Sequence, residues 1–366
     1  MGRLLVCSEA DPPSVNMADS LIGSGGWEDM GADGGLRFLS KGETFMVRIP
    51  DMHIRHDDLD VEAEAFGIKV DDVIVMSKHS SSSGTPSLTA HPIGNPHEND
   101  FGGRAETFVK ASPALMTDAL RKIVAYNDVP GTQTCFEVTH HGPWLDRPTF
   151  YIEIGSDDSQ WHDRHKADIL ARVITDLEPD YDAPVVIGVG GGHYAPRFSE
   201  MVLKKRVSFG HMIPNYQLEG RDDDDIVRML RDAAAASGTN VVYLHRKSMK
   251  KPVENRLSEL IASAGLERAG TDDFDDLSAS RRRSRRSPCR GSPSGARRGS
   301  FRRPSGYRCG SPSRSSRPTG RIRSSGTRRA PCRRCSAVPL SSCGESPSHR
   351  DPCEGPRCRR RRRTSR

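Results

Sequence analysis

The chain has 366 residues, of which 34% are hydrophobic and 28% charged, and its net charge of +7 averages two unlike parts. Residues 1–277 hold 28 basic and 45 acidic side chains, a net charge of −17, whereas residues 278–366 hold 27 arginines and three acidic residues, a net charge of +24. No run of 18 apolar residues occurs, which excludes a transmembrane helix, and the N-terminus lacks the apolar stretch of a signal peptide. We therefore expect a soluble, cytoplasmic protein with a catalytic domain over residues 1–277 and a separate segment over 278–366.

Within residues 1–277, short apolar runs alternate with helical spacings, and this pattern predicts an α/β fold. The expected strands cover residues 3–7, 44–49, 73–76, 133–139, 149–154, 185–189 and 241–244. The expected helices cover residues 16–22, 113–126, 159–177, 223–235 and 252–264, with a further helix beginning at Pro196. The run 185–189 is apolar throughout, as expected for a central parallel strand that is covered on both faces.

Residues 79–106 show neither the helical nor the strand period, so we expect a long loop there. A connection of this length is uncommon in a compact domain and is usually either functional or disordered. Its content of histidine, asparagine and aspartate favours a function.

Histidines and carboxylates follow the ends of several expected strands, where ligands bind in an open α/β sheet. This combination is the ligand chemistry of zinc, which in a catalytic site keeps a position for water and lowers the pKa of that water to about 7. The candidate residues are His91, His97, Glu98, His140, His141, Glu153 and His193. No second histidine completes an H-E-x-x-H motif after His97-Glu98, which excludes a zincin helix. For each single histidine, a hydrogen-bonded core or surface role is the alternative.

The adjacent pair His140 and His141 lies on or just after an expected strand. Successive side chains of a strand point to opposite faces, so we expect only one of the two rings to reach the site.

Three glycines, Gly190, Gly191 and Gly192, follow one expected strand and precede a helix. They partly match a dinucleotide fingerprint, but Pro196 intrudes and no acidic residue ends the following strand, so we expect no such cofactor. Backbone N–H groups at a helix N-terminus would still suit a phosphate or a developing oxyanion.

Residues 278–366 consist mainly of Arg, Ser, Pro, Gly and Cys, which cannot bury enough apolar surface to offset the entropy of ordering, so we expect disorder. One interpretation is a basic arm that attracts phosphate. The other is translation in a shifted frame, because repeated GAC aspartate codons read out of step give CGA arginine codons. The acidic stretch 272–276 does stop just before the arginine run 281–286. Cys332 and Cys335 have zinc-ribbon spacing, but without an ordered scaffold we expect no metal there.

Several motifs resemble the archaeal and plant type of D-aminoacyl-tRNA deacylase. They are HPIGN at 91–95, THHGP at 139–143, EIGS at 153–156 and GGGHYAP at 190–196, and the stretches 204–213 and 246–250 continue the match. The resemblance covers residues 3–277 and leaves out the arginine-rich segment. It implies a zinc-dependent hydrolase, with two zinc ions per subunit, that cleaves the ester between a D-amino acid and tRNA. It also implies a three-layer mixed α/β sheet similar to the phosphorylase and peptidyl-tRNA hydrolase group.

On this resemblance, the motifs assign three roles. The metal ligands are His91, His140 and His193. The general base is Glu98 or Glu153, within hydrogen-bond reach of the attacking water. The amides of residues 190–192 receive the negative charge that develops on the ester.

Binding of tRNA by an acidic domain requires local basic surface. The sequence offers two clusters, Lys204, Lys205 and Arg206, and Arg246, Lys247 and Lys250. They could hold the acceptor stem while the unpaired 3′ end enters the site, and the alternative is that both are solvated helix ends. We expect a monomer without a protein or membrane partner. The 45 acidic residues against 11 lysines predict a halophilic archaeal source.

Two rival functions stay open at this point. A zinc amidohydrolase or carboxypeptidase-like peptidase would use the same metal chemistry on an amide. An RNA-binding protein without enzymatic activity would act through the arginine-rich segment.

Overall fold

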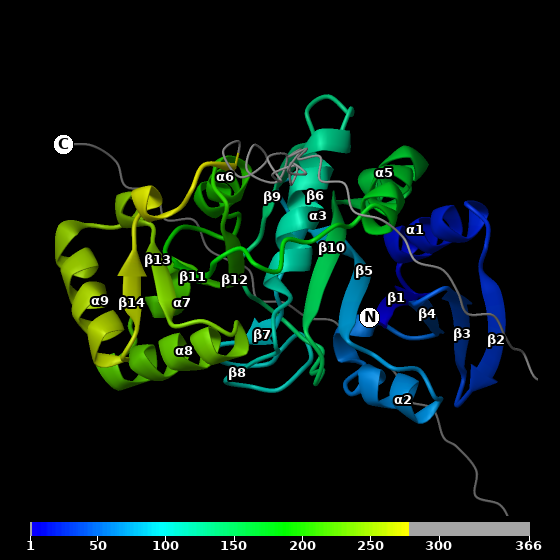
Figure 1. Cartoon of the computed structure of the whole chain (residues 1–366), viewed down its shortest axis with the longest axis horizontal. Coiled ribbons are helices and arrows are strands. Elements are labelled where there is room, and N and C mark those ends of the chain that lie inside the picture. The colour runs from blue at the N-terminus through cyan, green and yellow to red at the C-terminus, as the bar shows by residue number, and fades with distance from the viewer. Residues whose placement is uncertain (1, 278–366) are drawn as a thin grey trace, which may run out of the picture. The chain divides into compact units, whose positions relative to one another are not determined.

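The structure is a computed structural model that describes residues 2–277 (Figure 1). These residues all lie in the first of two compact units. None of the helices within residues 2–277 is long and apolar enough to cross a membrane. The predictions of disorder, of a basic arm and of no metal at Cys332 and Cys335 concern residues 278–366, which lie outside the described part of the chain.

Eight strands form a mixed sheet in the order β2-β3-β4-β1-β5-β10-β6-β9. They are β1 (Arg3–Ser8), β2 (Glu28–Asp33), β3 (Leu36–Lys41), β4 (Thr44–Ile49), β5 (Asp72–Ser80), β6 (Ser87–His91), β9 (Gln133–Phe136) and β10 (Thr149–Ser156). β4, β1, β5 and β10 run parallel, whereas β6 is antiparallel to β10 and parallel to β9. This reversal places His91, at the end of β6, opposite Tyr151 in β10.

Four parallel strands form a second sheet in the order β12-β11-β13-β14. They are β11 (Val185–Val189), β12 (Ser208–Ile213), β13 (Val241–Leu244) and β14 (Glu267–Ala269), and a two-stranded sheet pairs β7 (Gly94–Asn95) with β8 (Thr107–Phe108). Helix α6 (Pro196–Lys204) packs on one face of the four-stranded sheet, and α8 (Asp223–Ala236) and α9 (Lys251–Ser263) pack on the other. The prediction that 185–189 is a parallel strand covered on both faces is therefore confirmed.

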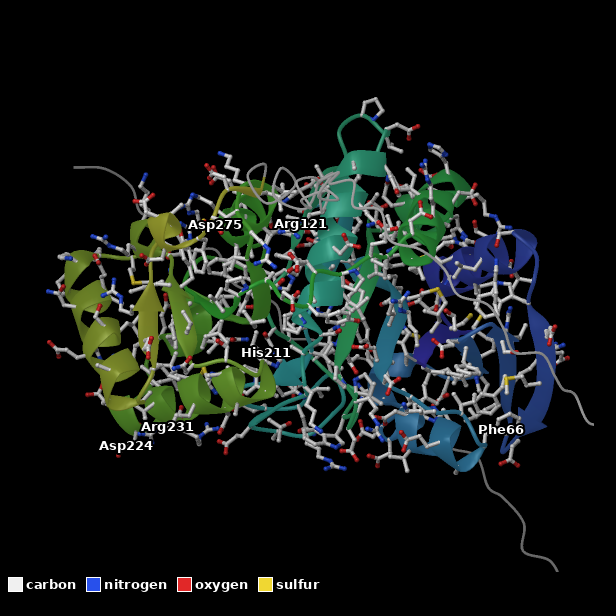
Figure 2. The ribbon with its side chains drawn as sticks, in the orientation of Figure 1. Phe66, Arg121, His211, Asp224, Arg231 and Asp275 are labelled. Atoms are coloured by element: carbon white, nitrogen blue, oxygen red, sulfur yellow. The ribbon has the colours of Figure 1, made fainter. Side chains whose placement is uncertain are left out.

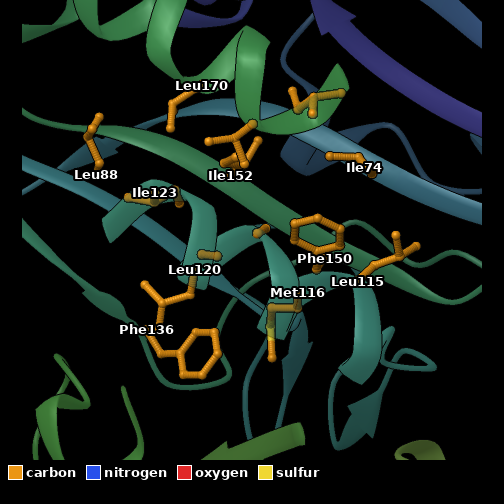
Figure 3. Packing of buried hydrophobic residues seen from close by; sticks show 14 of the residues in the cluster. Ile74, Leu88, Leu115, Met116, Leu120, Ile123, Phe136, Phe150, Ile152 and Leu170 are labelled. Atoms are coloured by element: carbon orange, nitrogen blue, oxygen red, sulfur yellow. The ribbon is translucent and has the colours of Figure 1, made fainter. Parts of the chain in front are cut away.

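Three helices, α1 (Pro12–Gly23), α3 (Pro113–Tyr126) and α5 (Arg164–Thr175), cover one face of the large sheet. Figure 3 shows Ile152 of β10 and Leu88 of β6 in this core, close to Leu170 of α5. Because side chains alternate along a strand, the residues between these apolar positions point to the opposite face. That face, partly covered by α2 (Leu59–Ala65), carries the polar residues of β6 and β10.

The structure confirms the predicted α/β class and most predicted elements, several of them to the residue. The predicted helix over 159–177 is wrong in one respect, since it divides into α4 (Asp158–Trp161) and α5. The side chain of Asp163 accepts hydrogen bonds from two amides of the first turn of α5, so it begins a new helix. The finer assignment to the phosphorylase and peptidyl-tRNA hydrolase type stays a prediction.

The long loop predicted over residues 79–106 is also wrong. His79 lies in β5, one residue before its end, and β6 is a buried strand in the interior of the large sheet. Its sequence, Ser-Leu-Thr-Ala-His, is too short and too mixed to show a period, and pairing with β10 and β9 makes it a strand. The strands β2 and β3 and the helix α2 were not predicted.

Candidate metal centre

The polar face of the large sheet carries a cluster of seven histidine and glutamate side chains. They come from β5, β6 and β10 and from the segments after β9 and β11: His79, His91, Glu137, His140, His141, Glu153 and His193. Two groups have ligand atoms that all lie within 4.8 Å of one another, and they are His91 with His140 and His141, and His79 with Glu137 and His193. The cluster brings together five of the seven residues that the sequence analysis selected.

The three-histidine group presents its nitrogens in one common arrangement. In His91, His140 and His141 the Nδ1–H donates to a backbone carbonyl oxygen, at 3.2, 2.7 and 2.7 Å. A carbonyl can only accept, so Nδ1 carries a hydrogen and Nε2 is the nitrogen left to face a metal. This hydrogen bond on the outer nitrogen is typical of histidines that bind a metal. In His91 the Nε2 atom is buried without a hydrogen-bond partner among the described residues.

Both members of the pair His140 and His141 reach the cluster, which corrects the prediction that only one would. The strand β9 ends at Phe136, so the pair lies beyond it, and His141 has a φ of +44°. This left-handed turn interrupts the alternation of a strand, and the two rings lie 4.5 Å apart between centroids.

Glu137 lies at the centre of the second group. Its Oε2 is 2.9 Å from Nε2 of His193 and 3.1 Å from Nδ1 of His79, and it is 3.7 Å from Nε2 of His140 in the first group. Its Oε1 is buried without a hydrogen-bond partner among the described residues. A buried carboxylate oxygen of this kind is costly unless a cation or donor meets it.

Glu153 lies between the two groups. Its Oε1 is 3.5 Å from Nε2 of His91 and its Oε2 is 3.6 Å from Nδ1 of His79. Within residues 2–277, Oε2 of Glu153 joins Nε2 of His91 and Oε1 of Glu137 among the buried polar atoms without a hydrogen bond. Three such atoms in one cluster fit a site that is completed by metal ions.

His140 and His141 of the first group differ in charge from His79 of the second. Burial lowers the pKa of His141 to about 3 and that of His140 well below its usual value, so both rings are neutral, as metal ligands must be. Burial also opposes a charge on His79, but the carboxylates of Glu137 and Glu153 outweigh it and raise the pKa of His79 to about 11. Without metal, the second group therefore holds a proton where a cation would bind.

A buried chain of side chains supports the first group from behind. The Tyr151 ring stacks on His91, with 5.1 Å between centroids, and its hydroxyl lies 3.3 Å from Nδ1 of His53. Nε2 of His53 lies 3.1 Å from a carboxylate oxygen of Asp11, the N-cap of α1. Because that carboxylate accepts from Nε2–H, the Tyr151 hydroxyl donates to Nδ1, which fixes the ring on which His91 stacks.

The four-stranded sheet, called the small sheet below, supports the first group as well. Thr139, next to His140, donates its hydroxyl to Nδ1 of His211 at 3.0 Å, while Nε2–H of His211 donates to the carbonyl of Val109 at 2.8 Å. His211 lies near the middle of the molecule (Figure 2) and is fully buried, and burial lowers its pKa to about 4. The ring is therefore neutral and ties β12 to the segment that carries the ligands.

The glycine loop borders the cluster at His193. Gly190 and Gly191 have φ values of +106° and +91°, which favour glycine. Their amides already donate, to the carbonyl of Ile213 and to the Ser248 hydroxyl, so the predicted role in receiving charge is left to Gly192 alone. This corrects the prediction for Gly190 and Gly191.

Two other predicted residues lie outside the cluster. Glu98 is exposed on the loop after β7 and belongs to neither of the two groups. His97 instead holds that loop, because its Nε2 donates to the carbonyl of Gln217 at 2.8 Å.

Sequence reasoning missed two members of the cluster, His79 and Glu137. His79 was placed in the expected long loop rather than in β5. Glu137 follows the apolar pair Cys135-Phe136, and an acid in an otherwise buried strand segment was the signal that could have revealed it.

The first predicted basic cluster is engaged in ion pairs. Lys204 pairs with Glu200, Lys205 with Asp276, and Arg206 with Asp180 through two nitrogens. In the second, Arg246 pairs with Glu254 at 2.6 Å, while Lys247 and Lys250 are exposed.

Comparison with known proteins identifies the family. Residues 66–269, which include the whole cluster, match the family model described as D-aminoacyl-tRNA deacylase. The chain belongs to the D-aminoacyl-tRNA deacylase family. This confirms the resemblance and the predicted class of enzyme, a hydrolase that removes D-amino acids from tRNA.

Individual relatives support the assignment to this family. A D-aminoacyl-tRNA deacylase of Methanococcoides burtonii is 38% identical over 273 residues, which cover 73% of this chain and 56% of that protein. One of Methanosarcina mazei is 35% identical and is matched over 90% of its length, with 72% of this chain covered. A crystal structure of a conserved protein of unknown function is 29% identical, with a TM-score of 0.68 over 75% of this chain and 98% of that one.

Proposed function

We propose that the cluster binds two zinc ions and that this centre hydrolyses the ester of D-aminoacyl-tRNA, releasing the D-amino acid and tRNA. His91, His140 and His141 would hold one ion, and His79, Glu137 and His193 the other. The observation that carries this proposal is the first group, in which three Nδ1–H groups donate to carbonyls and one ring nitrogen of each histidine lies within 4.8 Å of the others. When bound, such ions polarise a carbonyl and lower the pKa of water.

Glu153 is the general base in this proposal. Its carboxylate lies between the two groups and is buried, and its pKa falls far below the usual range because the attraction of His91 and His79 outweighs burial. It takes a proton from water as the water oxygen bonds to the ester carbon. The carbon–oxygen bond to the ribose then breaks, and the same proton passes to the ribose oxygen. The exposed Glu98, the other predicted base, lies outside the cluster.

Tyr194 is placed to stabilise the charge on the ester oxygen. Its hydroxyl lies 3.0 Å from Nε2 of His79, whose Nδ1 faces the two carboxylates. If a cation were held at Nδ1, Nε2–H would donate to the Tyr194 oxygen and the hydroxyl hydrogen would be free to donate to substrate. The amide of Gly192 is the second donor we assign.

The full chain, freed of metal by a chelator and then given zinc, should regain hydrolysis of D-tyrosyl-tRNA and leave L-tyrosyl-tRNA intact. Full activity in the chelator would contradict the metal centre, and hydrolysis of acyl-peptides in place of tRNA esters would favour the peptidase alternative. We further propose that the enzyme acts as a monomer in the cytoplasm of a halophile, where its acidic surface maintains solubility.

A further inference from the structure

A cavity lies at the carboxyl ends of β13 and β14 and is lined in part by His245, next to the glycine loop. Its volume is about 970 Å³, and its cationic side chains are Arg197, Arg246, Lys247 and Arg268. The carboxyl ends of parallel strands are where ligands bind in open α/β sheets. Two of these side chains, Arg246 and Lys247, belong to the second basic cluster that the sequence analysis selected, and the catalytic roles proposed above do not use the cavity.

The glutamates of the cavity are already neutralised. Glu200 pairs with Arg197 and Lys204, and Glu254 pairs with Arg246 and Lys251.

Two cations of the lining have no acidic partner among the residues that the structure describes. Lys247 has no ion pair within residues 2–277, and the hydrogen bond of Arg268 is to the hydroxyl of Ser258. Both side chains are exposed, and a single acid of the lining, Asp272, remains near them. In a domain with 45 acidic and 28 basic residues, this arrangement fits an anionic ligand from outside the chain.

The glycine loop links the candidate metal centre to this cavity, because a Cβ on Gly191 would lie 3.4 Å from Nδ1 of His245. The side chain of His193 is 36% exposed, whereas Glu137 and Glu153 are buried, so substrate reaches the cluster past His193. The glycine loop next to His193 rests on Ser248, whose hydroxyl accepts from Gly191 and donates to the carbonyl of His245. His245 is itself part of the lining of the cavity.

We propose that this cavity binds phosphates of the single-stranded 3′ end of tRNA, chiefly through Lys247 and Arg268. The inference rests on the proposed function, because an ester held at the cluster leaves the preceding phosphates to emerge past His193. An unpaired RNA end is flexible enough to turn from one concave site into the next. The cluster Lys204, Lys205 and Arg206 is a poorer candidate, since all three are bound to acids of the chain itself.

The test removes two charges in the full zinc-loaded chain, so that residues 278–366 contribute equally to every variant. In Lys247→Gln/Arg268→Gln, KM for D-tyrosyl-tRNA should rise roughly tenfold with kcat retained. The slope of log KM against log salt should fall by about 0.7 for each phosphate that the variant no longer binds. The matched control is Arg37→Gln/Lys69→Gln, which removes the same charge from exposed side chains of the large sheet region.

A small substrate separates the two proposals. D-tyrosyl-adenosine carries the ester without the phosphates, and every variant should hydrolyse it as the unmodified chain does. If the unmodified chain hydrolyses both substrates and the double variant keeps its KM and salt slope for tRNA, the phosphate site is overturned while the proposed function stands. Loss of the same magnitude in the Arg37/Lys69 control would also overturn it, and failure of the unmodified chain to hydrolyse either substrate would overturn both.

Discussion

The metal centre and the basic cavity lie on either side of one glycine loop, and they are built in opposite ways. The candidate metal centre is buried except at the half-buried His140, His141 and His193, its side chains come from the large sheet and the segments around it, and every ring is held by a carbonyl, a carboxylate or a hydroxyl. The cavity belongs to the small sheet, and the cations we assign to it are exposed. Buried charges respond to protons and metal, whereas exposed charges respond to salt. The two regions should therefore be separable by pH and ionic strength.

The sharpest test of the buried region is Glu153→Gln. The amide keeps the shape of the side chain but cannot take a proton, so kcat for D-tyrosyl-tRNA should fall by about 10²–10⁴-fold while KM changes little. The matched control is Glu98→Gln, an exposed carboxylate outside the cluster that should leave kcat unchanged. Equal losses in both variants, measured by steady-state kinetics, would contradict the assignment of the base.

Local sequence patterns predict part of the fold and part of the candidate site. The strands and helices with a strong period were predicted well, and the strand-end histidines and carboxylates include five of the seven side chains that gather on one face of the sheet. The prediction failed where long-range pairing decides the structure. β6 is a strand because β10 and β9 pair with it, and no local pattern shows this.

The sequence analysis missed two residues of the cluster for the same physical reason. His79 and Glu137 become neighbours, 3.1 Å apart, because β5, β10, β6 and β9 are adjacent in the sheet, and that order is not local information. The two adjacent histidines were misjudged because a left-handed residue cannot be read from strand alternation. Likewise, the glycine amides could be seen as possible donors, but their acceptors lie on β12 and on residue 248.

Zinc affinity should depend on pH through the second group. The pKa of His79 is raised to about 11 in the metal-free protein, so at any lower pH its proton must leave before a cation binds. Proton and zinc compete, and the apparent affinity should therefore rise with pH, by about tenfold per unit for each proton displaced. Competition against a chromophoric chelator between pH 6 and pH 9 measures this, with proton release counted by calorimetry in two buffers. An affinity that stays constant with pH would contradict the assignment.

His211 of β12 contacts Thr139, next to the histidine pair, and this contact should make the stability of the folded protein depend on acid. The pKa of His211 falls to about 4 in the folded protein from an ordinary value near 6.5. Between these values the unfolded chain binds a proton that the folded chain does not, so stability decreases as pH falls from 6.5 to 4, by about 3 kcal/mol. His211→Gln retains a donor for the Val109 carbonyl and should remove this part of the pH dependence. Denaturant unfolding measures it, and the exposed His162→Asn is the control that should keep the slope.

The smallest effect expected is that of salt on the buried region, and it tests the comparison most directly. Screening at about 0.1 M salt acts over roughly 10 Å through water and reaches buried pairs far less. Hydrolysis of D-tyrosyl-adenosine, which meets only the metal centre, should therefore keep its kcat as salt rises, while KM for D-tyrosyl-tRNA increases. Equal salt dependence for both substrates would mean that ionic strength acts on the chemistry itself. In that case the division between a proton-controlled centre and a salt-controlled cavity would not hold.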